Sequence, residues 1–106
     1  MSKPAPLPPL QAKVRLYHDA SGKTELLGFA DLTIADAFVI KGIRVLMGKP
    51  KEDKPGEPFI SFPARKAGGA ANARWFEVAH PLSAECRLAA RETVLRAYQR
   101  EARKTG

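Results

Sequence analysis

The chain has 106 residues, a formal net charge of +7 and 44% apolar residues. A chain of this length supports one domain with a modest core, and its apolar content is too high for a disordered protein. No apolar run approaches the roughly 18 residues that a membrane-spanning helix needs, and the N-terminus lacks the pattern of a signal peptide. The single cysteine, Cys86, is also untypical of exported small domains. The sequence therefore predicts a soluble cytoplasmic protein with no membrane partner.

The N-terminal residues 1–11 contain four prolines and predict a flexible tail of polyproline type. The folded domain is expected to cover residues 12–104. The tail includes the letters PLPP, which fit a P-x-x-P ligand, but many disordered tails contain such a motif. Whether the tail has a partner is left open.

Strands are expected where apolar and polar residues alternate with a period of two. They cover residues 13–18, 25–34, 38–47, 59–62 and 74–80, about five in all. The small and polar residues Asp19–Lys23 predict a hairpin turn, and Ala35–Ala37 predict a tight connection. The apolar phase changes between Ile40 and Ile43, which predicts a bulge near Gly42.

The segment between the last two strands contains two adjacent cations, Arg65 and Lys66, followed by Gly68 and Gly69. A charged loop rich in proline and glycine, Gly48–Pro58, comes before these strands. The two strands are expected to form a hairpin, with the cations in its exposed connection. The folding of a hairpin does not require this pair of charges.

The last expected element is a helix that begins after Ser83. Ser83 can accept a hydrogen bond from a backbone N–H of the first turn, and Glu85 complements the positive end of the helix dipole. Its apolar stripe is expected to contain Ala84, Leu88, Leu95, Tyr98 and Ala102, with Val94 beside them. Arg91 projects near the centre of this stripe, where a buried cation would need a carboxylate or a subunit boundary as its partner.

These elements predict an α+β fold, in which an antiparallel sheet built of hairpins carries one C-terminal helix. Both faces of the long strands are apolar, with Leu27 and Phe29 on one face and Leu32 and Ile34 on the other. One helix covers only one face of a sheet. The second face, or the sheet edge, is therefore expected to meet a second subunit.

The positive charge is concentrated in two parts of the chain. Residues 44–75 carry seven cations and three acids, and residues 83–106 carry six cations and three acids, whereas residues 11–43 are balanced. This distribution suits a polyanionic partner such as nucleic acid. The alternative is a basic solvated surface without a specific partner.

No enzyme, cofactor or small-molecule substrate is indicated. The letters SGKT (Ser21–Thr24) end like a phosphate-binding loop, but Tyr17 stands where the first glycine of that motif belongs. His18 and His80 have no further ligands at metal spacing, so no metal is expected. Cys86 lies in the first helical turn and is expected to be a small packing residue rather than a reactive thiol.

Three separated segments resemble the stage V sporulation protein G (SpoVG) family, which comprises small bacterial regulators associated with septation and sporulation. The segments are DAFVIKGIRVLMG (Asp36–Gly48), FISFPARK (Phe59–Lys66) and Phe76–Glu101, which begins FEVAHPLSAECR. The resemblance implies antiparallel strands with a C-terminal helix, assembled as a homodimer through the sheet. It also implies that the protein binds DNA, or RNA, and regulates gene expression such as transcription.

The resemblance further implies which residues bind nucleic acid. The strand-end Pro-Ser-Arg-Lys of the family corresponds to Pro63–Lys66, with alanine in place of serine, so Arg65 and Lys66 are the expected anchors. Possible flanking contacts are Arg44, Arg74 and Lys41. The chain departs from the family in its proline tail, its longer loop after Met47 and the lack of acidic residues after Lys66.

Two hypotheses of different classes follow. The first is a dimeric nucleic-acid-binding regulator, with DNA ahead of RNA. Exposed aromatic residues are expected to be scarce, and Trp75 is expected in the core, which favours duplex or backbone contacts over base stacking on single strands. The second is a protein-interaction module of the septation and cell-division machinery, without direct nucleic-acid binding. Both hypotheses rely on a homodimer.

Overall fold

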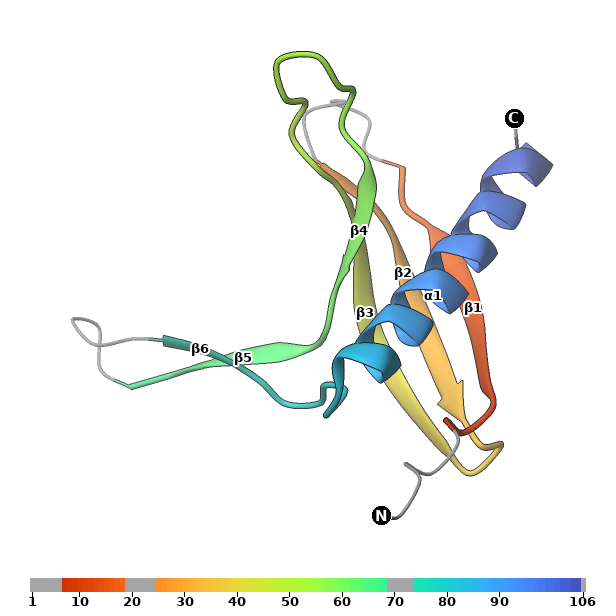
Figure 1. Cartoon of the computed structure of the whole chain (residues 1–106), viewed down its shortest axis with the longest axis vertical. Coiled ribbons are helices and arrows are strands. Elements are labelled where there is room, and N and C mark those ends of the chain that lie inside the picture. The colour runs from red at the N-terminus through yellow and green to blue at the C-terminus, as the bar shows by residue number, and fades with distance from the viewer. Residues whose placement is uncertain (1–6, 19–24, 69–73, 106) are drawn as a thin grey trace, which may run out of the picture.

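The computed structural model describes residues 7–18, 25–68 and 74–105. The elements are β1 (Leu10–Leu16), β2 (Leu26–Ile34), β3 (Phe38–Met47), β4 (Pro58–Ser61), β5 (Ala64–Ala67), β6 (Arg74–Glu77) and α1 (Ala84–Thr105). The first four strands form an antiparallel sheet in the order β1-β2-β3-β4, and α1 lies across one face of it (Figure 1). β5 and β6 form a separate two-stranded hairpin. The predicted α+β fold is confirmed, with six described strands instead of about five.

The long strands pair as the sequence predicts. β1 begins at Leu10, three residues before the expected start, and pairs with β2 from Leu10 opposite Ile34 to Leu16 opposite Gly28. The turn expected over Asp19–Lys23 lies outside the described residues. β3 and β4 are joined by a hairpin extension, in which Gly48 donates to the carbonyl of Glu57 at 2.9 Å.

The bulge expected near Gly42 is confirmed. Ala30 pairs with Ile43 and Leu32 pairs with Ile40, so two residues of β3 face one residue of β2 between these pairs. Gly42 has a φ of 82°, which is a conformation that side chains rarely adopt. Because of the bulge, Ile40 and Ile43 both face the helix side of the sheet.

The connection between β2 and β3 is the three-residue segment Ala35–Ala37, which contains a tight turn. Ala37 donates to the carbonyl of Ile34 at 2.9 Å, and the two central residues, Ala35 and Asp36, have φ values of 53° and 52°. Positive φ at both positions defines a type I′ turn, whose twist matches that of the flanking strands. Alanine is an unfavourable residue in this conformation.

Replacing Ala35 by asparagine is expected to raise the free energy of unfolding by about 0.5–1 kcal/mol, because asparagine tolerates the left-handed conformation. This gain corresponds to an increase of about 2–6 °C in the melting temperature, measured by circular dichroism. Ala37→Asn is the control, since Ala37 does not have a positive φ and should gain nothing. Equal stabilisation by both variants would contradict the strain argument.

The core lies between α1 and the sheet. Its fully buried apolar residues are Val14, Ala30, Leu32, Ile43, Val45, Phe62, Ala90, Val94 and Ala97. The start of the helix is as predicted, because the Ser83 hydroxyl accepts a hydrogen bond from the backbone N–H of Cys86 at 3.1 Å. The domain therefore buries one face of the sheet under one capped helix.

The buried face of the helix differs from the predicted stripe. The small residues Ala90 and Ala97, with Val94 between them, lie against the sheet, whereas Leu88 is 52% exposed. Small side chains let the helix approach the strands closely. Arg91 follows Ala90 and projects about 100° away from it. The expectation that Arg91 projects from the centre of the buried face was wrong, because its side chain is exposed.

The pairing expected for the last two strands was also wrong. β4 pairs with β3, from Arg44 opposite Ser61 to Met47 opposite Pro58, and β6 pairs with the unforeseen strand β5. Pro63 separates β4 from β5, because proline has no N–H for the sheet ladder. The chain turns there, and the hairpin projects away from the sheet (Figure 1). The radius of gyration of 15.8 Å accordingly exceeds the roughly 13 Å of a compact 100-residue domain.

Candidate nucleic-acid interface

One contact closes the base of the projecting hairpin, and two contacts of Arg87 link this base to the helix and the core. The backbone N–H of Val78 donates to the carbonyl of Pro63 at 2.8 Å. The Arg87 guanidinium lies 3.7 Å from a carboxylate oxygen of Glu77 and 5.7 Å from the ring centre of Phe62. The root of the hairpin is therefore linked to both the sheet and the first turns of α1.

Arg65 and Lys66 lie within strand β5, whereas they were expected in the connection of a hairpin. Consecutive residues of a strand point to opposite faces. Cross-strand partners share a face, and Lys66 pairs with Trp75 whereas Arg65 pairs with Phe76. We call the two sides the Trp75 face, with Lys66 and Trp75, and the Phe76 face, with Arg65, Phe76 and Arg74.

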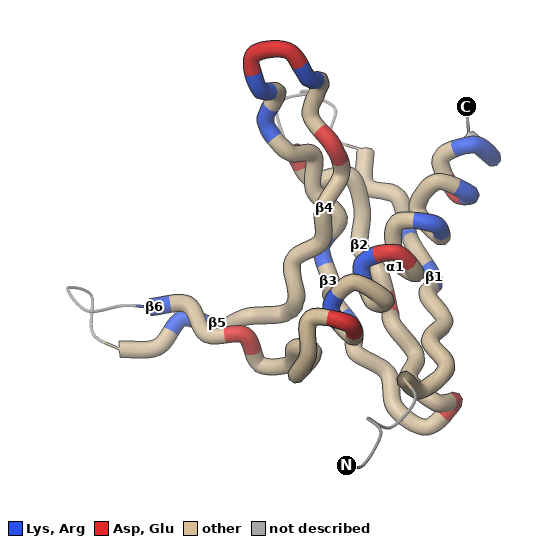
Figure 2. Tube along the Cα trace, viewed as in Figure 1, with Lys and Arg blue, Asp and Glu red and all other residues tan. Residues whose placement is uncertain are grey.

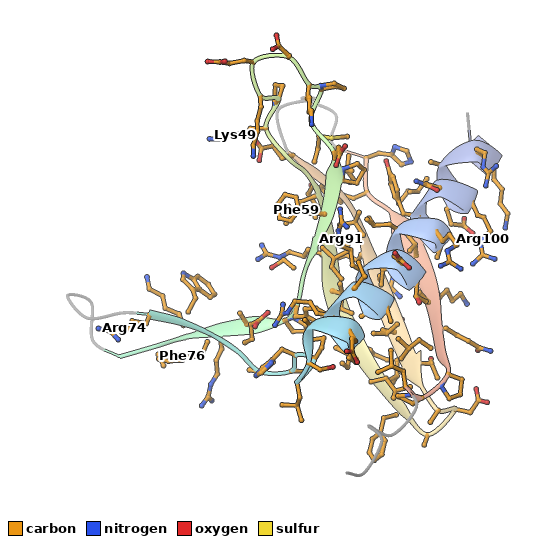
Figure 3. All side chains as sticks on the ribbon, in the orientation of Figure 1. Lys49, Phe59, Arg74, Phe76, Arg91 and Arg100 are labelled. Atoms are coloured by element: carbon orange, nitrogen blue, oxygen red, sulfur yellow. The ribbon has the colours of Figure 1, made fainter. Side chains whose placement is uncertain are left out.

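Each face combines cations with an exposed aromatic ring. Trp75 is 69% exposed and Phe76 is 52% exposed, and Figure 3 shows Phe76 and Arg74 on the projecting hairpin, away from the core. The expectation that Trp75 belongs to the core was wrong, since neither face of this hairpin is covered by another layer of the described chain. Alternation in the sequence identifies a strand but does not reveal whether a second layer covers it.

A surface hollow joins the Trp75 face to the sheet. It is lined by Gly42, Arg44, Pro63, Ala64 and Trp75. Arg44 is exposed on β3, where it pairs with Phe29 of β2 on the sheet face turned away from α1. The structure therefore brings Arg44 and Trp75 to one site, although 31 positions separate them in the sequence.

The five predicted nucleic-acid contacts are all exposed, but they do not form one cluster. Lys66 shares the Trp75 face, and Arg44 lies at the hollow beside it, whereas Arg65 and Arg74 occupy the Phe76 face. Lys41 is exposed on β3 but does not line the hollow. The structure therefore distributes these exposed cations over the two faces of the hairpin and the adjoining strand β3.

The charge on the hairpin is largely uncompensated. Figure 2 shows acidic and basic residues along the trace of the hairpin. Within its described strands, Glu77 is the one acidic residue, and it is paired with Arg87. Among the described residues, Arg44, Arg65, Lys66 and Arg74 form no ion pair. Unpaired cations on a projecting element give a positive potential that attracts polyanions.

A second basic surface lies along the C-terminal half of α1. Arg96, Arg100 and Arg103 line a shallow groove beside residues 10–12 of the edge strand β1, and Figure 3 shows Arg100 at this part of the helix. Arg96 is 3.7 Å from a carboxylate oxygen of Glu92, one turn earlier. This arginine row is far along the helix from the hairpin, whose base contacts the first turns (Figure 1).

Two other kinds of functional feature are absent from the described residues. No three of their histidine, cysteine, aspartate or glutamate side chains form a group that could hold a metal ion. No helix formed by these residues is long and apolar enough to cross a membrane. His80 is engaged locally, with its Nδ1 atom 2.9 Å from the carbonyl oxygen of Pro81.

The fold and the site define a small α+β protein whose helix covers one face of an antiparallel sheet and whose unpaired cations project on a hairpin. Comparison with family models identifies the family to which the chain belongs within this class. The SpoVG model matches residues 11–100, and the chain belongs to the SpoVG family. The resemblance identified in the sequence is therefore confirmed.

Curated relatives agree with this assignment. A protein of Acholeplasma laidlawii (strain PG-8A), named "Putative septation protein SpoVG", is 30% identical over 86 residues, which are 81% of each chain. The protein of the same name from Phytoplasma australiense is also 30% identical, over 74% of this chain and 73% of its own. The one from Treponema denticola is 30% identical over 83% of this chain and 84% of its own. No solved structure matches the chain significantly.

Proposed function

We propose that this protein binds nucleic acid through the β5–β6 hairpin and acts as a dimeric regulator of gene expression. The observation that carries the proposal is the hairpin itself, which projects from the sheet with Arg65, Lys66 and Arg74 exposed and unpaired. These cations take no part in the core. A projecting basic element is therefore better explained by a polyanionic partner than by the requirements of folding.

The chemistry of the two anchors differs. The Arg65 guanidinium can bind a phosphate with two parallel hydrogen bonds, whereas the Lys66 ammonium acts as a point charge. Because they lie on opposite faces of β5, they would contact different phosphates. Each phosphate contact releases counterions, so binding should weaken as salt rises.

The structure indicates the binding element more directly than it indicates the kind of nucleic acid that is bound. The expected scarcity of exposed aromatic residues favours duplex or backbone contacts over base stacking on single strands. The structure removes this premise, since Tyr17, Phe38, Phe59, Trp75 and Phe76 are each more than 40% exposed. Duplex DNA remains the first target to test, and RNA belongs in the same experiment.

The dimer is proposed to form through the sheet face turned away from α1, at the end of this face that carries Val39, so that Arg44, which lies opposite Phe29, stays accessible. This face carries Phe29, which packs edge-to-face on Tyr17 with ring centres 6.2 Å apart, and Val39, which is 48% exposed. Asp31 lies on the same face, and its Oδ1 atom is buried without a hydrogen-bond partner among the described residues. A second copy at this end would cover Val39 and supply a donor to Asp31.

The test is fluorescence anisotropy with labelled duplex DNA, and with RNA of the same sequence, across a salt series. The double variant Arg65→Ala/Lys66→Ala should reduce the slope of log K against log salt by about 1.8 on duplex DNA, since each lost phosphate contact removes about 0.9. Arg96→Ala/Arg100→Ala is the matched control, because it removes the same charge from α1. Equal loss in both variants, or no binding by the native protein at low salt, would contradict the assignment to the hairpin.

The second candidate is a protein-interaction module of the septation machinery. It is supported by the name that the relatives carry, septation protein, and by the apolar residues Trp75, Phe76 and Val78, which are exposed at the hairpin. If the native protein binds neither DNA nor RNA, this candidate becomes the better explanation. Both candidates require a dimer, so a monomeric mass in light scattering at micromolar concentration would count against each.

A further inference from the structure

We infer that Trp75 and Arg44 form a binding site for an unpaired nucleobase and its phosphate, so that the hairpin binds single-stranded nucleic acid in preference to duplex. The inference rests on the proposed nucleic-acid function and adds to it the class of ligand and the binding residue. It depends on three observations: the exposed ring, the hollow beside it and the cations around it.

The ring of Trp75 is available to a ligand. Its residue is 69% exposed, and it forms neither of the ring contacts found in the described structure, which are those between Tyr17 and Phe29 and between Arg87 and Phe62. The hollow next to the ring is otherwise lined by Gly42, Ala64, Pro63 and Arg44. Gly42 and Ala64 have little or no side chain, so they leave space for a planar group.

Two cations lie next to this ring. Lys66 is the cross-strand partner of Trp75, at a position where side chains are close neighbours, and Arg44 lines the hollow. No acidic residue lines the hollow, and Glu77, which shares this face of the hairpin, is paired with Arg87 at 3.7 Å. The charges therefore favour an anionic ligand with a flat apolar part, which describes a nucleotide.

A single strand fits this arrangement better than a duplex does. In a duplex the faces of each base are stacked on its neighbours and are not available to a protein ring. In a single strand a base can stack on an aromatic side chain while the adjacent phosphates meet cations. Lys66 and Arg44 are positioned to bind the phosphates that flank a base on Trp75.

The experiment uses the intrinsic fluorescence of the full-length protein, which contains one tryptophan. The probes are a 15-nucleotide oligo-dT, a 15-nucleotide oligo-rU and a 15-base-pair mixed-sequence duplex. Both single strands should quench Trp75 and bind at least ten times more tightly than the duplex. A difference between oligo-dT and oligo-rU would then separate DNA from RNA as the preferred strand.

The variants test the ring and the cation separately by anisotropy with labelled oligo-dT. Trp75→Leu should weaken binding about 10- to 100-fold, and Trp75→Phe, which retains an aromatic ring, should recover most of the loss. Phe38→Leu is the control for the ring, because Phe38 is 76% exposed and belongs to a different part of the sheet. Arg44→Ala should weaken binding more than Lys41→Ala, since Lys41 is exposed on the same strand but outside the hollow.

Three outcomes would overturn the inference. If the duplex binds as tightly as oligo-dT and leaves the fluorescence of Trp75 unchanged, base stacking is wrong while the proposed nucleic-acid function stands. If no probe binds at low salt, the inference and the proposed function both fail. If Trp75→Leu retains the native circular dichroism spectrum but changes the mass in light scattering, Trp75 belongs to a subunit interface and is not a nucleobase site.

Discussion

Replacing Phe62 by alanine is expected to lower the free energy of unfolding by about 3–5 kcal/mol. Phe62 is 2% exposed and lies between β4 and β5, where the chain leaves the main sheet. Its ring packs in the core, and the Arg87 guanidinium lies 5.7 Å from the ring centre. The substitution would leave a cavity under the first turns of α1 and remove the surface on which Arg87 rests. A loss of this size is a large part of the total stability of a small domain, about 5–15 kcal/mol.

Urea denaturation followed by circular dichroism measures this effect. Phe62→Leu should cost about 1–1.5 kcal/mol, since an apolar side chain of similar size still fills most of the space. Phe38→Ala provides the surface reference, because Phe38 is 76% exposed and should change stability by about 0.5 kcal/mol or less. If Phe62→Ala cost no more than Phe38→Ala, the packing of this residue between sheet and helix would be wrong.

Replacing Gly28 by alanine is expected to lower the free energy of unfolding by about 1–3 kcal/mol. Gly28 lies in the middle of the sheet, paired with Leu16 of β1 and Val45 of β3. A Cβ atom on Gly28 would lie 2.6 Å from the carbonyl oxygen of Arg15, which is a backbone atom and cannot rotate away. β1 would have to shift, and its pairing with β2 would weaken.

Gly42 provides an informative comparison for Gly28. A Cβ atom on Gly42 meets nothing within 4 Å, but the φ of this residue is 82°. Gly42→Asn should therefore cost less than Gly42→Ala, whereas Gly28→Asn should be at least as harmful as Gly28→Ala. Both pairs are compared by the urea midpoint. If asparagine were the milder substitution at both positions, the carbonyl contact would not be the reason that β2 has glycine at this position.

Features that depend on neighbouring residues could be predicted from the sequence. The phase change between Ile40 and Ile43 identified the bulge, because apolar residues on both sides of Gly42 must face the same core. The position of Ser83 identified the start of the helix, because a hydroxyl there can accept a backbone hydrogen bond. The alternation in the long strands also predicted the antiparallel sheet.

Features that depend on distant contacts could not be predicted in this way. The apolar stripe predicted on α1 from the helical spacing includes Leu88, but Leu88 is exposed, and the small residues Ala90 and Ala97 lie against the strands, where they permit close packing. Strand β5, which pairs with β6, was also not predicted from the sequence. The four-residue strand β5 follows directly after Pro63 and carries the letters ARKA, which have neither the β-branched residues nor the alternation typical of a strand.

In the candidate site, too, some features could be predicted from the sequence and others depend on distant contacts. Exposed cations could be recognised because lysine and arginine are rarely buried, so Arg65, Lys66 and Arg74 were found from composition and family resemblance. Their distribution over two faces depends on the register of β5 and β6, which places Lys66 opposite Trp75. The proximity of Arg44 to Trp75 depends on the turn of the chain at Pro63. Neither could be inferred without the fold.

The arginine row on α1 has a consequence for solubility. β1 is an edge strand of the sheet. The backbone N–H of Tyr17 donates to the carbonyl of Leu27, and the carbonyl of Pro9 accepts from the N–H of Ala35. The odd-numbered residues of β1 therefore direct their backbone groups toward β2. The even-numbered residues of β1 direct theirs outward, which would allow a foreign strand to add to the sheet. Two copies that joined through this edge would bring the positive side chains of Arg96, Arg100 and Arg103 together on both sides. Charge repulsion thus protects this edge from the open-ended strand addition that leads to aggregation.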